Sequence, residues 1–145
     1  MYLTARRYVS EYSDKELSTE LNELTKDIRK GYNVQGFTVE AMYWRKANAI
    51  HNWFVKTVQF GIDDCKKYEV DTDQLKELLN IVTAVLDKTA EPEDVLPSTA
   101  GFFFGDSEYN ERYFENLEYT KEELTKLLEN FGEDGSWSFD YQSSW

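Results

Sequence analysis

The sequence predicts a single α+β domain, with four to five helices packed on a small, mostly antiparallel or mixed sheet. Segments near both ends of the chain alternate apolar and polar residues, which is typical of strands. Between them, several segments repeat apolar residues at steps of three and four, which is typical of helices. The 145 residues suffice for one domain with a hydrophobic core, and we expect residues 1–145 to form it.

The first third of the chain predicts a strand, a helix and a strand. Residues 1–10 alternate weakly, and residues 36–43 alternate strictly. Between them, Ser13 and Glu16 have the spacing of a capping box, and Gly31 ends a helical pattern. We therefore expect an amphipathic helix over residues 14–30. Its apolar residues are Leu17, Leu21, Leu24 and Ile28.

Residues 45–59 predict a second helix that ends near Gly61. Its buried face is a stripe of four apolar residues, with His51 just beside it. Residues 66–70 indicate a short strand. Asp71 and Gln74 then have the spacing of a helix cap, followed by a leucine-rich helix. The four residues of the stripe are Ala47, Ile50, Phe54 and Val58.

The last third begins with a loop over residues 91–97 and a glycine-flanked apolar run, 101–105, which we expect to be a buried strand or turn. Residues 108–130 hold either one long helix or two. The capping-box spacing of Thr120 and Glu123 favours a break near residues 119–120. Residues 136–141 alternate and predict a final strand, so both termini lie in strands.

Charge is distributed unevenly along the chain. The net charge of −12 divides into −1 over residues 1–90 and −11 over residues 91–145. A strongly acidic final third should repel nucleic acid and anionic membranes, so we expect no direct nucleic-acid binding and no membrane association. The same surface would attract a basic protein surface, including one that normally holds nucleic acid. The alternative is that the charge only serves solubility.

Composition excludes several other classes of protein. A single cysteine forbids an intramolecular disulfide and fits a reducing compartment. With no long apolar run and no signal-peptide pattern, we expect a cytoplasmic protein. One histidine and one cysteine match no metal-ligand spacing, and no phosphate-binding motif is present. We therefore expect no metal and no cofactor. No catalytic residue can be assigned, and the patterns favour a protein that is not an enzyme.

A candidate pocket lies on the second predicted helix. Trp44, Asn48 and His51 follow one another at steps of four and three, so they line one flank. Arg45 could supply positive charge, and His51 could move a proton near neutral pH. Aromatic walls could come from Phe103 and Trp137. The alternative is that His51 is a satisfied boundary histidine and that the tryptophans only pack.

A candidate acidic interface lies in the last third of the chain. Acidic residues recur there at steps of three and four, which places them on one helical face, with tyrosines beside it. Rows of carboxylates can imitate the spacing of phosphates, and tyrosines are enriched in protein interfaces. The alternative is a solvated helix face. The residues are Glu108, Glu111, Glu115, Glu118 and Glu122, with Tyr109 and Tyr113.

Four segments occur together in this chain: YWRKANAIHNWFV at 43–55, GIDDC at 61–65, LPSTAGFFFG at 96–105 and YQSSW at 141–145. In this combination the chain resembles a family of small proteins from bacteriophages, prophages and bacterial genomes. The resemblance covers nearly the whole chain, including its first three residues. It implies a stand-alone, phage-linked protein acting in the host cytoplasm, and it supplies no catalytic residues.

Three hypotheses about function follow. The first is a non-enzymatic phage accessory or counter-defence protein that binds a basic host protein through its acidic face. The second is a small-molecule or nucleotide binder, or an enzyme, that uses the candidate pocket. The third is a virion or assembly component. The sequence does not determine the oligomeric state.

Overall fold

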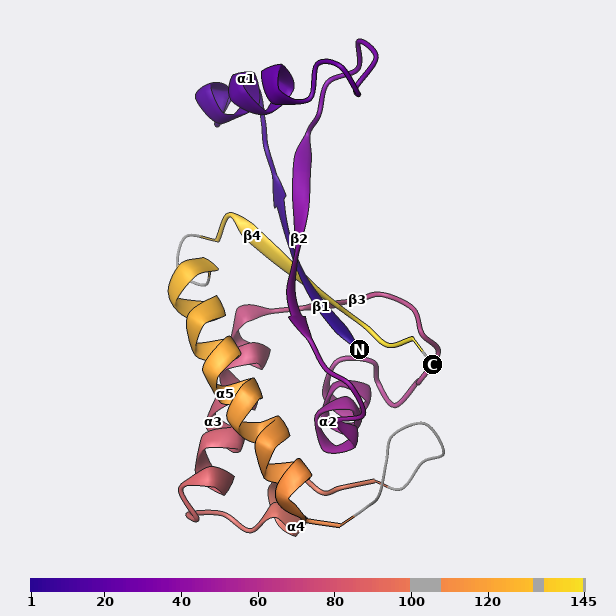
Figure 1. Cartoon of the computed structure of the whole chain (residues 1–145), viewed down its shortest axis with the longest axis vertical. Helices are drawn as coiled ribbons and strands as arrows, with labels where there is room; N and C mark the ends of the chain where they lie inside the picture. Colours follow the sequence, from indigo (N-terminus) through magenta and orange to yellow (C-terminus); the bar gives the residue numbers. More distant parts are fainter. Residues whose placement is uncertain (100–107, 132–134, 145) are drawn as a thin grey trace.

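The computed structural model describes residues 1–99, 108–131 and 135–144. The predicted strand or turn over residues 101–105 therefore lies outside the described residues. Strands and helices alternate along most of the chain, as Figure 1 shows. The strands are β1 (Tyr2–Tyr8), β2 (Gly36–Tyr43), β3 (Tyr68–Val70) and β4 (Trp137–Gln142). The helices are α1 (Lys15–Leu24), α2 (Asn48–Thr57), α3 (Thr72–Leu86), α4 (Pro92–Val95) and α5 (Glu111–Phe131).

The predicted α+β class is confirmed, and the sheet is entirely antiparallel. Its four strands lie in the order β2–β1–β4–β3, so the first and last strands of the chain are neighbours. Leu3 pairs with Tyr141, and Ala5 pairs with Phe139. All four side chains are buried, because alternate residues of a strand point to the same face. This face of the sheet carries the helices.

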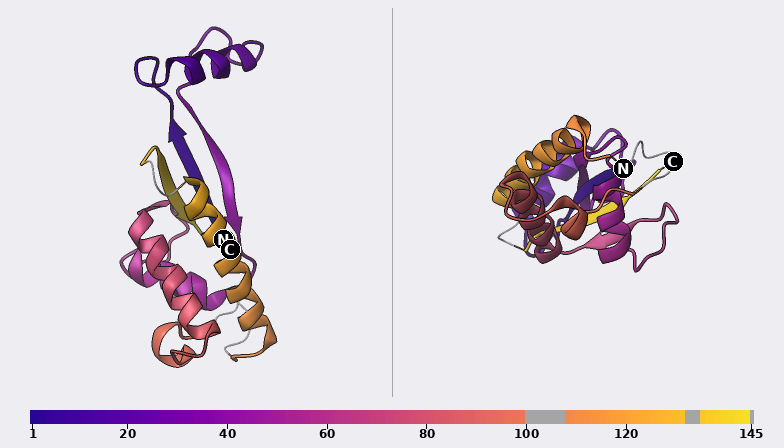
Figure 2. Two further views of the ribbon diagram at one scale, coloured as in Figure 1. Left: turned by 90° about the vertical axis from the view of Figure 1, so that its left-hand side faces the viewer. Right: turned by 90° about the horizontal axis from the view of Figure 1, so that it is seen from below.

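Helix α2 lies against this buried face. The ring of Phe54 stacks on that of Tyr141 with their centroids 3.9 Å apart, and Trp44 meets Phe54 edge-on at 5.7 Å. The predicted stripe on α2 is buried, as expected. Helices α3 and α5 pack on each other beside the sheet (Figures 1 and 2). The predicted cap of α3 is confirmed, because Asp71 and Gln74 form a reciprocal capping box.

The predicted break near residue 120 is wrong, because α5 is one continuous helix from Glu111 to Phe131. Thr120 is fully buried and does not cap a helix. Its hydroxyl donates to the carbonyl of Asn116 at 2.6 Å and accepts from the indole N–H of Trp44 at 2.9 Å. A threonine that bonds back to the preceding turn and to a neighbouring element is compatible with a helix interior.

Two other boundaries differ from the prediction. Residues 91–97 are not purely a loop, because they contain the short helix α4, which has Pro92 at its first position. Helix α1 spans only Lys15–Leu24, and turns follow it as far as Gly31. Its N-cap residue is Asp14, whose side chain does not cap the helix. The Ser13 hydroxyl donates to the Asp14 carboxylate instead, at 2.8 Å.

The helices of this chain were predicted to pack on the sheet, but helix α1 does not. It belongs to residues 10–35, which connect β1 to β2 and which we call the tip. Figures 1 and 2 show the tip at the far end of these two strands, away from helices α2 to α5. Gly36 starts β2 where the backbone is too close to the Arg7 carbonyl for a side chain, so the two strands meet tightly beneath the tip. We call the remainder of the molecule the body.

Candidate functional site

The segment that suggested a pocket is mostly core. Helix α2 begins at Asn48 without a side-chain cap and buries six of its ten residues, so solvent reaches only a narrow strip of it. Amphipathic surface helices bury one stripe, whereas helices buried around most of their circumference belong to a core. The concentration of rare residue types in this segment therefore reflects packing against several neighbours.

His51 is 4% exposed and lies between two oxygen atoms. Its Nδ1 is 2.7 Å from the hydroxyl of Tyr141, and its Nε2 is 3.0 Å from a carboxylate oxygen of Asp63. Burial raises the pKa of Tyr141, so its phenol stays protonated and shares a hydrogen bond with Nδ1. A carboxylate only accepts hydrogen bonds, so Nε2 donates to Asp63. The histidine thus joins α2 to β4 and to the turn after α2.

Asn48 and Trp44 also make structural contacts. The Asn48 amide donates to the carbonyl of Thr99 at 2.9 Å, and its oxygen accepts from the hydroxyl of Ser98 at 3.1 Å. These bonds tie the start of α2 to the segment that precedes residue 100. Trp44 is 1% exposed and is held by its bond to Thr120 on α5. Both side chains thus hold neighbouring elements together.

The other predicted pocket residues lie elsewhere. Arg45 is exposed. Trp137 lies at the opposite end of β4 from Tyr141, where it packs on Phe131 at 4.4 Å and Phe37 at 5.5 Å. Phe103 is outside the described residues. The structure thus brings Trp44, Asn48 and His51 into one core region and places neither Arg45 nor Trp137 with them.

The cavity near these residues supports their assignment to the core. A partly open cavity of about 20 Å³ adjoins the start of α2, between Asn48 and Asn116, and has room for about one water molecule. Ligand pockets are typically more than tenfold larger. His51 is not among the residues that line this cavity. The described residues also contain no cluster of side chains suited to a metal ion.

The predicted acidic face is largely present on α5. Glu111, Glu115, Glu118 and Glu122 are all exposed on this helix, whereas Glu108 precedes it. The tyrosines are less accessible than expected. Tyr113 is buried and donates its hydroxyl to the carbonyl of Leu96 at 2.9 Å, and Tyr109 meets it edge-on at 5.0 Å. Tyr113 is therefore a core residue.

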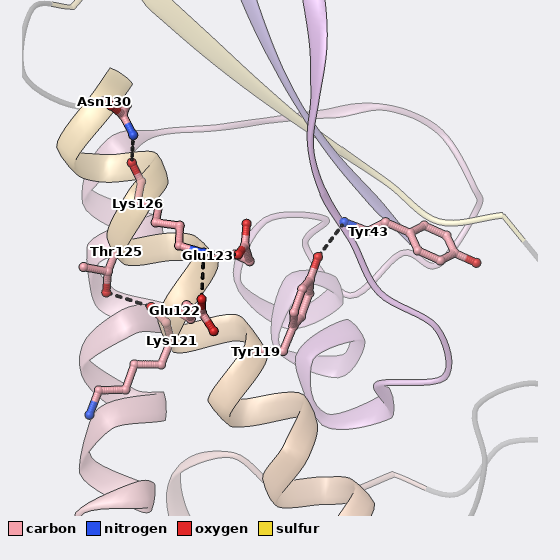
Figure 3. Close-up of polar contacts among 8 residues, drawn as sticks. All are labelled: Tyr43, Tyr119, Lys121, Glu122, Glu123, Thr125, Lys126 and Asn130. Atoms are coloured by element: carbon pink, nitrogen blue, oxygen red, sulfur yellow. Dashed lines mark hydrogen bonds and ion pairs between the residues drawn. The ribbon is translucent and has the colours of Figure 1, made fainter.

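Positive charge neutralises only the C-terminal half of this face. Figure 3 shows Lys126 reaching Glu122 and Glu123, at 2.7 and 2.8 Å. The hydrogen bond from Lys126 lowers the pKa of Glu122, which keeps that carboxylate ionised. Within the described part of the chain, Glu111, Glu115 and Glu118 form no ion pair. On α5 itself, these three carboxylates form the half of the face that no ion pair among the described residues neutralises.

A groove of about 510 Å³ lies beside this half, between α3, α4 and α5. Its apolar lining comes from Leu86 on α3, Pro92 on α4 and Phe114 on α5, together with Val85 and Ala90. Its carboxylates are Glu91, Glu93 and Glu118, all of them exposed, and Lys88 is its one basic residue. We call these nine residues the acidic groove. An apolar floor with a carboxylate rim suits a long cationic side chain.

The sequence analysis did not assign Glu91, Glu93 or Phe114 to the interface. The acidic run around Pro92 was a visible signal, but it lies in a segment predicted to be a loop. Only the packing of α4 against α3 and α5 places its carboxylates next to Glu118. Asp63 and Tyr141, the two partners of His51, were missed for the same reason, because they lie 12 and 90 residues away along the chain.

The fold and this groove define a small α+β protein with an acidic surface groove and a histidine that is committed to the core. No family model, curated protein or solved structure matches the chain. The resemblance to a phage family therefore stays a prediction. No helix among the described residues is both long and apolar enough to cross a membrane.

Proposed function

We propose that the chain is a non-enzymatic binding protein whose acidic groove and adjoining α5 face hold basic side chains of a partner protein. The observation that carries the proposal is the groove itself, in which carboxylates from two helices surround an apolar floor. An arginine or lysine placed there would lay its aliphatic stem on Leu86 and Pro92. Its cationic head would meet Glu93 or Glu118, and Phe114 offers an aromatic face for a cation–π contact.

The charge distribution also supports a basic protein as the partner. Residues 91–145 carry a net charge of −11, and the carboxylates at the start of α5 form no ion pair among the described residues. Such a surface steers a basic partner toward the groove and accelerates its association. The spacing of Glu111, Glu115 and Glu118 along a rigid helix would imitate a row of phosphates. A protein that normally holds nucleic acid is therefore a suitable target.

The biological setting of this proposal rests on the resemblance to phage proteins. In that setting the chain is an accessory or counter-defence factor that binds a basic host protein in the host cytoplasm. The competing hypothesis of a ligand pocket at Trp44, Arg45, Asn48 and His51 is less well supported. Three of these side chains, Trp44, Asn48 and His51, make hydrogen bonds to neighbouring elements, and the cavity at the start of α2 has room for only about one water molecule.

The test compares two variants of equal charge. Glu93→Lys combined with Glu118→Lys reverses the groove, while Glu69→Lys combined with Glu77→Lys reverses two exposed acids on β3 and α3. Each immobilised protein is exposed to host lysate at low and high salt and to a fluorescent oligo-arginine peptide. We expect the groove variant to lose at least tenfold in affinity for both, and the control variant to lose much less.

Salt supplies the second criterion, because contacts between exposed charges weaken as the Debye length shrinks. Capture of a basic protein that disappears at high salt and in the groove variant would support the proposal. Equal loss in both variants would show that only the net charge matters. Failure of the wild-type chain to capture any basic, salt-sensitive protein would contradict the proposal.

A further inference from the structure

The tip contains a helix whose apolar flank its own protein covers only in part. The one fully buried side chain of α1 is Ser18, while Leu24 is 84% exposed. Leu17, Leu21 and Leu24 follow at steps of four and three, so they line one flank of the helix. A helix that packs on its own protein buries its apolar stripe and exposes its polar residues. Helix α1 leaves Leu17 and Leu21 half-buried and Leu24 exposed.

Polar contacts explain how the tip is held in this orientation. The Asn22 side-chain oxygen accepts from the backbone N–H of Val34 at 2.9 Å, which attaches α1 to the chain entering β2. Arg29 donates to the carbonyls of Asn22 and Tyr32 at 3.0 and 2.9 Å, and it closes the turns after the helix. Hydrogen bonds therefore order the tip, and its large apolar side chains remain available to another surface.

The exposed apolar surface of the tip is large enough for a dimer interface. Tyr12, Leu24, Ile28 and Tyr32 are 98%, 84%, 77% and 79% exposed. At about 150 Å² for each large side chain, they offer roughly 600 Å² per copy. A standard interface buries about 800 Å² per partner, of which about 65% is apolar in homodimers. The tip can therefore supply the apolar part of such an interface by itself.

The charge distribution favours a second copy of this chain as the occupant. Residues 1–35 hold six acidic and six basic side chains, so the entire net charge of −12 lies on residues 36–145. Contact between two bodies would bring like charges together, whereas contact between two tips keeps the bodies apart at opposite ends. Figures 1 and 2 show the tip as the end of the molecule farthest from helices α3 to α5.

The charged residues of one tip also complement those of a second tip when the two copies are antiparallel. Glu16 and Glu20 lie in the first turns of α1, and Lys30 lies in the turns after it. Within the described residues these three side chains form no ion pair, whereas Lys26 pairs with Glu23 at 2.6 Å. An antiparallel arrangement places the first turn of one helix, with Glu16, beside the turns that follow the other helix, with Lys30, and the twofold axis repeats the contact.

We propose that the tip is a self-association surface, on which α1 of one copy packs antiparallel to α1 of a second copy. The leucine flank and the exposed residues Tyr12, Ile28 and Tyr32 form the centre of the interface. Glu16 of each copy faces Lys30 of the other at its rim. The resulting twofold dimer presents two acidic grooves at its outer ends. This inference does not depend on the proposed function, because no groove residue takes part.

The first experiment measures the molar mass of the full chain by light scattering after size-exclusion chromatography, over a range of concentrations. We expect twice the monomer mass of 17.1 kDa for the wild-type chain. Leu24→Glu combined with Ile28→Glu should give a monomer with an unchanged circular-dichroism spectrum, because both residues are exposed. The matched control is Phe60→Glu on the body, which is 86% exposed and should remain dimeric.

The second experiment tests the antiparallel arrangement by exchanging charges. Glu16→Lys alone should raise the dimer dissociation constant about tenfold, because the introduced lysine would face Lys30 of the partner. Adding Lys30→Glu should restore wild-type affinity. A wild-type monomer at every concentration would overturn the proposal and assign the tip to a different protein. A dimer that survives Leu24→Glu/Ile28→Glu, a monomeric Phe60→Glu variant, or a failed charge exchange would each overturn it as well.

Discussion

Two buried polar side chains of the α2 region differ in how their polar atoms are satisfied. His51 makes hydrogen bonds to Tyr141 and Asp63. Gln59, just after α2, is fully buried, and its amide nitrogen and oxygen have no hydrogen-bond partner among the described residues. A buried polar group without a partner loses its hydration and gains nothing in return. The histidine is therefore compatible with a stable core, whereas Gln59 is a local source of instability.

We predict that Gln59→Leu raises the free energy of unfolding by about 1 kcal/mol, because it removes the unsatisfied amide and keeps a side chain of similar size. Urea unfolding followed by circular dichroism measures the change. The control is Gln142→Leu, whose amide donates to the carbonyl of Cys65 at 2.9 Å and whose loss should lower stability. If Gln59→Leu is as destabilising as the control, the Gln59 amide has a partner in solution, such as a buried water.

At the scale of elements, α5 is attached to the segment before α2 through one buried bond. The indole N–H of Trp44 donates to Thr120, and both residues are almost completely buried. The same threonine hydroxyl bonds to the preceding turn of its own helix. Because the hydroxyl already makes these two bonds, the capping-box spacing at Thr120 does not end the helix. The side chain that would have capped a new helix joins two elements instead.

We predict that Thr120→Val lowers the free energy of unfolding by about 2 kcal/mol, because it leaves the buried indole N–H without its acceptor. Thr125→Val is the matched control. Thr125 lies on the same helix and bonds to its own preceding turn at 2.7 Å, but it is exposed and contacts no indole. It should change stability by less than about 0.5 kcal/mol. Equal effects of the two variants would indicate that the Trp44 bond contributes nothing.

At the scale of the whole molecule, the body and the tip are stabilised differently. The body has a continuous core formed by one sheet face and helices α2, α3 and α5. Helix α1 buries a single serine and is held mainly by hydrogen bonds to its own loop. Strands β1 and β2 are joined at the base of the tip without α1, since the backbone N–H of Val9 donates to the carbonyl of Gln35 at 2.9 Å. The tip therefore adds little to the stability of the body.

We predict that the body folds without the tip. Replacing residues 10–34 by Asn-Gly would join Val9 to Gln35 through a two-residue turn, which suits antiparallel neighbours. The unfolding free energy should change by less than about 1 kcal/mol, because α1 fully buries no apolar side chain. Thermal and urea unfolding measure the change. An unfolded or strongly destabilised product would show that the tip belongs to the folding unit of the body.

The sequence alone predicted the α+β class and most of the elements, because these depend on local periodicity. Strict alternation over residues 36–43 became β2, and the cap at Asp71 began α3, as expected. The same kind of pattern predicted the acidic row on α5. Prediction was wrong where a local signal had two possible uses, as at Thr120. It was also incomplete at α1, because periodicity identifies an apolar face without showing what covers it.

Tertiary structure decided which residues meet. It placed Tyr141 and Asp63 on His51 and so assigned the histidine to the core. It brought the carboxylates of α4 next to Glu118 to form the acidic groove. It also left the leucine flank of α1 only partly covered, with Leu24 exposed. These outcomes depend on contacts between residues far apart in the chain, which are selected by the packing of the whole core. The composition and spacing of the sequence determined the elements and the charge, while long-range packing determined the surfaces that can act.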